Sequence, residues 1–193
     1  MDVLTAIYQR RSIRHFTDAP VPASLVHELI RAATQAPSAV NQQPWVFGVI
    51  RGRRRLDGYS ERAKAHLLAI LPQALSLHRR ADTLASHEYN VFHHAGTLVF
   101  IAARPAPHHP EEDCCLAAQN LMLAAHALGL GTCPIGFARP WLNLPAVKAE
   151  LGIPGSCHVV MPLAVGWPAG QSAPVPREPP EIVCWQEDAR PAG

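Results

Sequence analysis

The sequence lacks the short motifs that mark the commonest nucleotide-binding and hydrolytic sites. It contains no Gly-x-x-x-x-Gly-Lys-Ser/Thr loop, no Gly-x-Gly-x-x-Gly segment after a predicted strand, and no Gly-x-Ser-x-Gly turn. No carboxylate pair is spaced for acid–base work, and the adjacent pairs His93-His94 and His108-His109 do not face together on a regular element, so we expect no metal site. If the chain is an enzyme, a cofactor is therefore expected to supply the reactive chemistry.

The sequence also has few cysteines and a small net charge. The five cysteines are odd in number and no two have Cys-x-x-Cys spacing, which predicts reduced thiols in a reducing compartment. The segment that begins Met1-Asp2-Val3 predicts an amphipathic helix, not a signal peptide, so we expect a cytoplasmic protein. With 17 basic and 15 acidic residues the net charge is +2, which does not indicate a general nucleic-acid binder.

One long stretch of the chain carries no charge. Between Cys114 and Ala138 there is no Asp, Glu, Lys or Arg, and the part up to Leu128 is rich in Ala and Leu, which favour a helix. Apolar residues occur on every side, which predicts a helix buried all round with one polar stripe through Gln119 and His126. These polar interruptions argue against a membrane span, which needs about 20 predominantly apolar residues.

Two glycines, Gly129 and Gly131, predict the end of this helix. The residues that follow, Thr132 to Gly136, predict a tight turn whose glycine leaves the backbone bare for a ligand. A flat ring could lie along Pro134-Ile135-Gly136, with a backbone N–H of the turn donating to a ring nitrogen.

The other apolar patterns predict a single domain over residues 1–193. The expected helices cover residues 3–9, 24–36, 56–80 and 144–151, with Ser24 as an N-cap and Pro72 as a break. The expected strands cover residues 45–50, 98–103 and 158–165. The proline-rich stretch 168–180 cannot form a compact element, so it must lean on another surface, for which a neighbouring subunit is one candidate.

A basic segment follows the first predicted helix. If residues 10–16 are extended, Arg10, Ser12 and Arg14 point the same way and form a phosphate clamp; a solvated basic loop is the alternative. The loop from Ala36 to Trp45 could present backbone and amide groups, or simply connect two elements. Residues 52–55 predict a solvated basic corner.

Five segments in order resemble the FMN-dependent nitroreductase family. They are Arg-Arg-Ser-Ile-Arg at 10–14, Ala-Pro-Ser-Ala-Val-Asn-Gln-Gln-Pro-Trp at 36–45, Gln-Asn-Leu-Met-Leu-Ala-Ala at 119–125, Gly-Leu-Gly-Thr at 129–132, and Val-Gly-Trp-Pro at 165–168 with Arg177. The resemblance implies an α+β fold around a mixed, mostly antiparallel sheet. It also implies a homodimer that exchanges its C-terminal tail and holds FMN at the subunit interface.

The resemblance also implies which residues touch FMN. The phosphate and ribityl end would meet Arg10, Arg11, Ser12, Arg14 and Arg177. The other subunit would bring Pro37, Ser38, Ala39 and Asn41 to the flavin, and the turn Pro134, Ile135 and Gly136 would pack on the ring near N5. Two departures stand out: the turn lacks the Glu-Gly or Gly-Gly of many members, and the late Lys-x-Arg of some members is reduced to Arg177.

The implied activity is transfer of hydride from NAD(P)H to FMN and of electrons to a nitroaromatic, a quinone or a similar acceptor. No side chain is assigned as a catalytic acid or base. Two alternatives stay open: other flavin chemistry on the same scaffold, such as reductive dehalogenation or oxygen-dependent flavin breakdown, and a non-catalytic flavin-binding or structural dimer. Residues 56–89 match no known pattern and could form an added lid, so the acceptor stays open. No nucleic-acid or membrane partner is expected.

Overall fold

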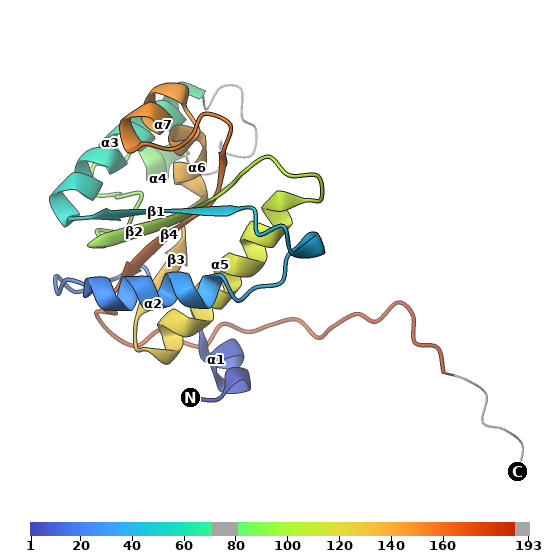
Figure 1. The fold of residues 1–193 in the computed structure, drawn as a ribbon. Helices are drawn as coiled ribbons and strands as arrows, with labels where there is room; N and C mark the ends of the chain where they lie inside the picture. The colour runs from blue at the N-terminus through green and yellow to red at the C-terminus, as the bar shows by residue number, and fades with distance from the viewer. Residues whose placement is uncertain (71–80, 188–193) are drawn as a thin grey trace, which may run out of the picture.

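The structure is a computed structural model, and it describes residues 1–70 and 81–187 (Figure 1). The longer helices are α1 (Val3–Gln9), α2 (Ala23–Ala33), α3 (Arg53–Ile70), α5 (Pro110–Ala127) and α7 (Pro145–Leu151). The shorter helical turns are η1 (Ala39–Asn41), α4 (Ala81–Ala85), η4 (Gly136–Ala138) and α6 (Arg139–Leu142). The strands are β1 (Trp45–Arg51), β2 (Thr97–Ala103), β3 (Gly131–Pro134) and β4 (His158–Gly166). The three predicted strands and the first, central and last predicted helices are confirmed.

Two predicted helices have other boundaries in the structure. Ser24 is not an N-cap: Pro22 occupies that position without a side-chain hydrogen bond, and the helix ends at Ala33 because the chain tightens into a turn ahead of Pro37. The third helix begins at Arg53, so the predicted basic corner at 52–55 is largely a helix start. The break predicted at Pro72 lies outside the described residues.

The sheet has four strands in the order β1-β2-β4-β3, and each neighbouring pair is antiparallel. The expectation of a mixed sheet was therefore wrong for the strands that the structure describes. The parallel contact is an isolated bridge between Ser12 and Thr132, too short to form a strand pair. Strand β2 is central and buried along its whole length, as its apolar run predicted.

Helices cover both faces of the sheet (Figure 1). Because strand side chains alternate, Leu98 and Phe100 of β2 pack in the cluster with α3 and α6, whereas Val99 and Ile101 pack in the cluster with α2 and α5. Each face thus has its own apolar core, and α5 lies across one of them.

Helix α5 is covered on one side. Leu121 and Ala125 are fully buried, but Cys115 and Gln119 are exposed and Leu116 is 46% exposed. Burial on all sides was therefore wrong for the single chain, because the sheet and α2 reach one face of the helix. No helix in residues 1–70 or 81–187 is both long and apolar enough to cross a membrane.

Gly129 ends α5 as predicted. It has φ +78°, Leu130 N–H donates to Ala125 O at 2.8 Å, and Gly129 N–H donates to His126 O at 3.0 Å, which is a Schellman ending. The tight turn predicted for 132–136 was wrong in its first part. Gly131–Pro134 forms β3, because these residues find hydrogen-bond partners along β4.

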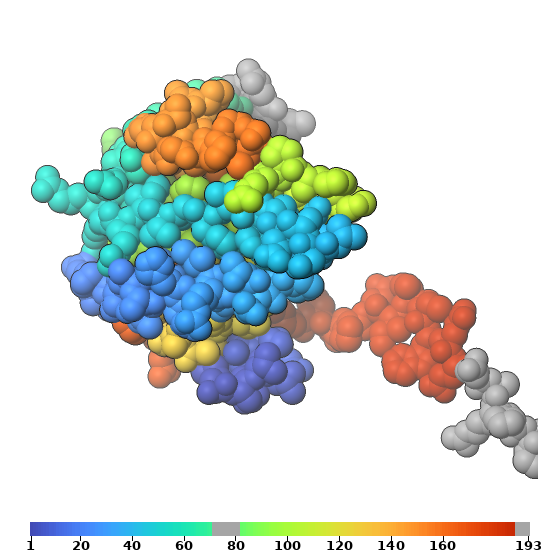
Figure 2. All heavy atoms as spheres, in the orientation of Figure 1, coloured from blue at the N-terminus to red at the C-terminus, as the bar shows by residue number. Residues whose placement is uncertain are grey.

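The C-terminal segment stands away from the rest of the chain. Residues 170–187 are exposed throughout. Gly170, Gln171, Ser172 and Pro174 line a cavity on the body of the molecule, and in Figures 1 and 2 the later part of the segment runs outward. Val183 is 90% exposed and Trp185 is 74% exposed. Exposed apolar side chains of this size are typical of surfaces that interact with another molecule.

Candidate functional site

The basic segment after α1 lies alongside β3. Ile13 N–H donates to Thr132 O at 2.9 Å, and Ser12 bridges the same threonine. Gly131 permits this close approach, since a Cβ there would lie 2.7 Å from a side-chain carbon of Ile13. The strand therefore sets the directions in which Arg10, Arg11 and Arg14 can reach.

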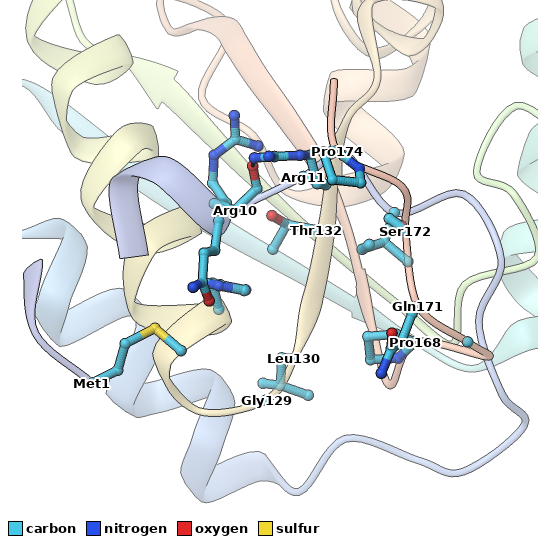
Figure 3. A pocket seen from close by; sticks show the side chains of 14 residues that line it. Met1, Arg10, Arg11, Gly129, Leu130, Thr132, Pro168, Gln171, Ser172 and Pro174 are labelled. Atoms are coloured by element: carbon cyan, nitrogen blue, oxygen red, sulfur yellow. Dashed lines mark hydrogen bonds between the residues drawn. The ribbon is translucent and has the colours of Figure 1, made fainter. Parts of the chain in front are cut away.

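One cavity opens beside this segment, with a volume of about 640 Å³; we call it the arginine pocket (Figure 3). Arg10, Arg11 and Thr132 lie on one side, and the tail residues Pro168, Gln171 and Ser172 lie on the other. The remaining lining residues are Met1, Gln9, Ile13, His126, Gly129, Leu130, Gly170 and Pro174.

The arginine pocket carries positive charge that is not balanced. Arg10 Nη1 and Arg11 Nε are buried and, within the described parts of the chain, have no hydrogen-bond partner. Burial lowers the pKa of Arg10, and the neighbouring charges of Arg177 and Arg11 lower it further. Buried guanidinium donors without acceptors fit a phosphate group, which offers oxygens and negative charge together.

Arg177 belongs to the same electrostatic group. Its charge contributes to lowering the pKa of Arg10, but Arg177 itself is exposed and is not among the residues that line the arginine pocket. Arg11 is partly committed to its own backbone, because its Nη1 donates to Tyr8 O and to Arg10 O at 2.7 Å each.

A second cavity, the turn pocket, has a volume of about 360 Å³ and lies on the other side of β3. Its lining residues are Arg14, Thr83, Tyr89, Val91, His93, Cys133, Pro134, Ile135, Gly136 and Phe137. Arg10 and Arg14 thus line different cavities, and the two do not act as one clamp. Burial raises the pKa of the Cys133 thiol, whereas the charges of Arg14 and Arg10 oppose the rise.

Of the turn residues that line the turn pocket, one has a backbone N–H that is available to a ligand. Ile135 N–H donates to Pro162 O at 2.8 Å, and Pro134 has no N–H. Gly136 is exposed, and no atom of the described residues lies within 4 Å of where its Cβ would be. Of the three residues predicted to face a flavin ring, Gly136 is therefore the one whose N–H can reach a ligand.

His93 is a site residue that the sequence reasoning missed. Burial lowers its pKa to about 4, with further lowering by Arg14, His15 and His94, so the imidazole is neutral near pH 7. The ring of Tyr89 meets it edge-on, with centroids 6.2 Å apart. Only the tertiary contact with Arg14 marks this histidine, so no sequence pattern could have found it.

The loop predicted to touch flavin, Pro37–Asn41, lies elsewhere. Val40, Asn41 and Gln43 have left-handed φ values of 45°, 57° and 45°. Such a backbone costs energy for residues other than glycine, most of all for a β-branched valine.

Asp113 holds this loop in shape. Its carboxylate is buried and accepts from Ala39 N–H at 3.3 Å and from Gln42 Nε2 at 2.9 Å. Ser38 Oγ also accepts from Gln43 N–H at 3.0 Å. The role of Asp113 was not predicted, because an acidic residue near a helix start is explained by the helix dipole alone.

The loop and the arginine pocket lie at opposite ends of α5. Asp113 is in its first turn and His126 is in its last turn. An 18-residue helix is about 27 Å long, so one chain does not bring the two groups of predicted residues together.

The model of the nitroreductase family matches residues 7–167. The chain belongs to the nitroreductase family. A curated relative, the NADH dehydrogenase of Thermus thermophilus, is 31% identical over 204 residues, which cover 96% of this chain and 97% of the relative. A 5,6-dimethylbenzimidazole synthase of Rhodospirillum rubrum is 30% identical over 202 residues, covering 96% and 90% of the two chains.

Solved structures agree with this assignment. The crystal structure of a nitroreductase with bound FMN from Bacteroides fragilis superposes with a TM-score of 0.76 at 27% identity, covering 95% of this chain and 96% of that one. The resemblance drawn from the five sequence segments is confirmed at the level of the nitroreductase family.

Proposed function

We propose that this protein is an FMN-dependent oxidoreductase that takes hydride from NAD(P)H and passes electrons to a small acceptor such as a nitroaromatic or a quinone. The observation that carries the proposal is one cavity lined by Arg10 and Arg11, each of which has a buried guanidinium nitrogen without an acceptor among the described residues. The phosphate of FMN is the ligand that would satisfy them. Family membership supports the same cofactor, since the Bacteroides relative was crystallised with it.

Each part of the site has its own task in this proposal. Arg10, Arg11 and Arg177 hold the phosphate, and Ser12 is fixed by its bridge to β3 so that Arg14 enters the turn pocket. FMN, when bound, supplies the two-electron chemistry. The exposed N–H of Gly136 and the charge of Arg14 stabilise negative charge that develops beside them.

The complete site requires a second copy of the chain. The loop containing Pro37, Ser38, Ala39 and Asn41 is about one helix length from the arginine pocket of its own subunit, so a partner supplies it. Exposed apolar side chains offer the surface for that partner: Leu4 and Tyr8 on α1, Leu116 on α5, and Trp185 in the tail. We propose that the tails exchange between the subunits and cover these faces.

Purification tests the proposal directly. The protein should carry a yellow FMN absorption that bleaches with NADH or NADPH under anaerobic conditions, and light scattering should give the mass of a dimer. A colourless protein that takes up no added FMN would overturn it. Arg14→Ala should weaken FMN binding by about 1.5–3 kcal/mol, the scale of hydrogen bonds to charged groups.

A second function is favoured by one comparison. A relative of 30% identity is a 5,6-dimethylbenzimidazole synthase, which points to flavin breakdown on the same scaffold. Aerobic incubation of the reduced protein separates the two functions. Intact FMN that reoxidises supports the oxidoreductase, whereas loss of flavin with formation of the benzimidazole supports the second function.

A further inference from the structure

The arginine pocket holds one more polar side chain, that of His126, which neither the sequence segments nor the comparisons assign. His126 lies in the last turn of α5 and lines the cavity together with Arg10 and Arg11. Its Nε2 is buried and, in the part of the chain that the structure describes, has no hydrogen-bond partner. Arg10, Arg11 and His126, from two distant segments of the sequence, therefore line one cavity, and each has a buried side-chain nitrogen without a hydrogen-bond partner among the described residues.

The charges that face His126 are cationic. Burial lowers the pKa of its imidazole, and Arg10 and Arg11 lower it further. Arg177 adds positive charge at Arg10. Helix α5 supplies no negative charge after Asp113 to balance these cations, because the sequence has no Asp or Glu between Cys114 and Ala138. In the free protein the imidazole is thus neutral near pH 7.

We propose that His126 is a third and titratable contact to the phosphate of FMN, so that this protein holds FMN more tightly as the pH falls from 8.5 to 6.5. The inference rests on the proposed function, because it assigns a role within the same cofactor site.

The direction follows from proton linkage. A dianionic phosphate beside His126 favours the protonated imidazole, so binding raises its pKa and takes up a proton. Affinity therefore increases as the pH falls through the pKa of the complex. Each unit by which binding raises that pKa increases affinity by at most about tenfold. The phosphate itself gains a proton near pH 6, which sets the lower end of the useful range.

The experiment compares wild type with His126→Gln, which keeps a donor but does not titrate. FMN and riboflavin are titrated separately into flavin-free protein at pH 6.5 and pH 8.5, and quenching of flavin fluorescence gives Kd. His27→Gln serves as a matched control, because His27 is exposed on α2 and does not line the cavity.

We expect wild type and His27→Gln to bind FMN more tightly at pH 6.5 than at pH 8.5, by at most about fivefold for a pKa change of one unit, because the pKa of the free imidazole lies below its ordinary value. His126→Gln should lose most of this gain, and riboflavin, which lacks the phosphate, should show no difference between the three proteins. Equal pH dependence in wild type and His126→Gln would overturn the inference and leave the proposed function intact. Failure of wild type to bind FMN at either pH would overturn the proposed function instead.

If His126→Gln does not fold, calorimetry of wild type tests the contact between His126 and FMN instead. Titrations at pH 7.5 in two buffers of different ionisation enthalpy measure the protons exchanged on binding. Net proton uptake with FMN and none with riboflavin supports the contact with His126. No uptake with either flavin contradicts it.

Discussion

The two ends of helix α5 are built in opposite ways. At its start, both oxygens of the Asp113 carboxylate accept hydrogen bonds from the loop of residues 38–43. These bonds stabilise a loop in which three residues have left-handed backbone conformations. At its end, Arg10, Arg11 and His126 present buried nitrogens that find no acceptor in the described residues.

The first end of the helix therefore stabilises the shape of a loop, whereas the second end is suited to binding a ligand. A strained loop that a buried carboxylate holds through hydrogen bonds can keep its form without a ligand, although Gln42 Oε1 has no partner among the described residues. A cavity lined by desolvated cationic side chains is incomplete until an anion enters. Substitutions at the first end should therefore act on folding, and substitutions at the second should act on FMN affinity.

The largest effect is expected from Asp113→Ala. Removal of the carboxylate leaves the Ala39 N–H without its acceptor and takes one of two acceptors from Gln42 Nε2, which still donates to His108 O, so the free energy of unfolding should fall by about 3 kcal/mol. Urea denaturation measures this change. Glu112→Ala is the control, because that neighbouring carboxylate is exposed, and it should stay within about 0.5 kcal/mol of wild type.

Arg10→Ala should show the opposite pattern. FMN binding should weaken by about 1.5–3 kcal/mol because a charged donor to the phosphate is lost. The unfolding free energy of the flavin-free protein should not fall, since a desolvated cation without a partner is removed. Fluorescence titration and urea denaturation give the two quantities. A large loss of stability with unchanged affinity would break the comparison between the two ends.

Ser38→Ala tests the loop end more finely. The hydroxyl accepts from Gln43 N–H, so its loss should lower the free energy of unfolding by about 1 kcal/mol. Ser24→Ala is matched to it, since Ser24 is exposed and does not cap α2. Equal thermal denaturation of these two variants would show that Ser38 does not support the loop.

The smallest effect is expected from Arg54→Ala. This arginine is exposed at the start of α3 and lines neither cavity, so both FMN affinity and stability should change by less than about 0.5 kcal/mol. A clear loss of affinity would mean that positive charge anywhere on the surface attracts FMN, and that the arginine pocket is not specific.

Much of the fold followed from local patterns. The buried run of β2 and the Ala-rich body of α5 were predictable because their own residues decide them. The additional strand β3 was not, because Thr132 and Cys133 are extended only by pairing with β4. The covered and uncovered sides of α5 were not predictable either, since a helix with apolar residues all round does not reveal how many surfaces meet it.

By itself the sequence determined the family, the order of the main elements and the residue types that we propose to bind phosphate, because these depend on short segments and their spacing. Only the tertiary structure decided that Arg10 and Arg14 enter different cavities, that His126 joins the arginines, and that Asp113 shapes the loop. The physical reason is that desolvation and hydrogen-bond satisfaction belong to the contacts between distant segments, and no single segment contains them.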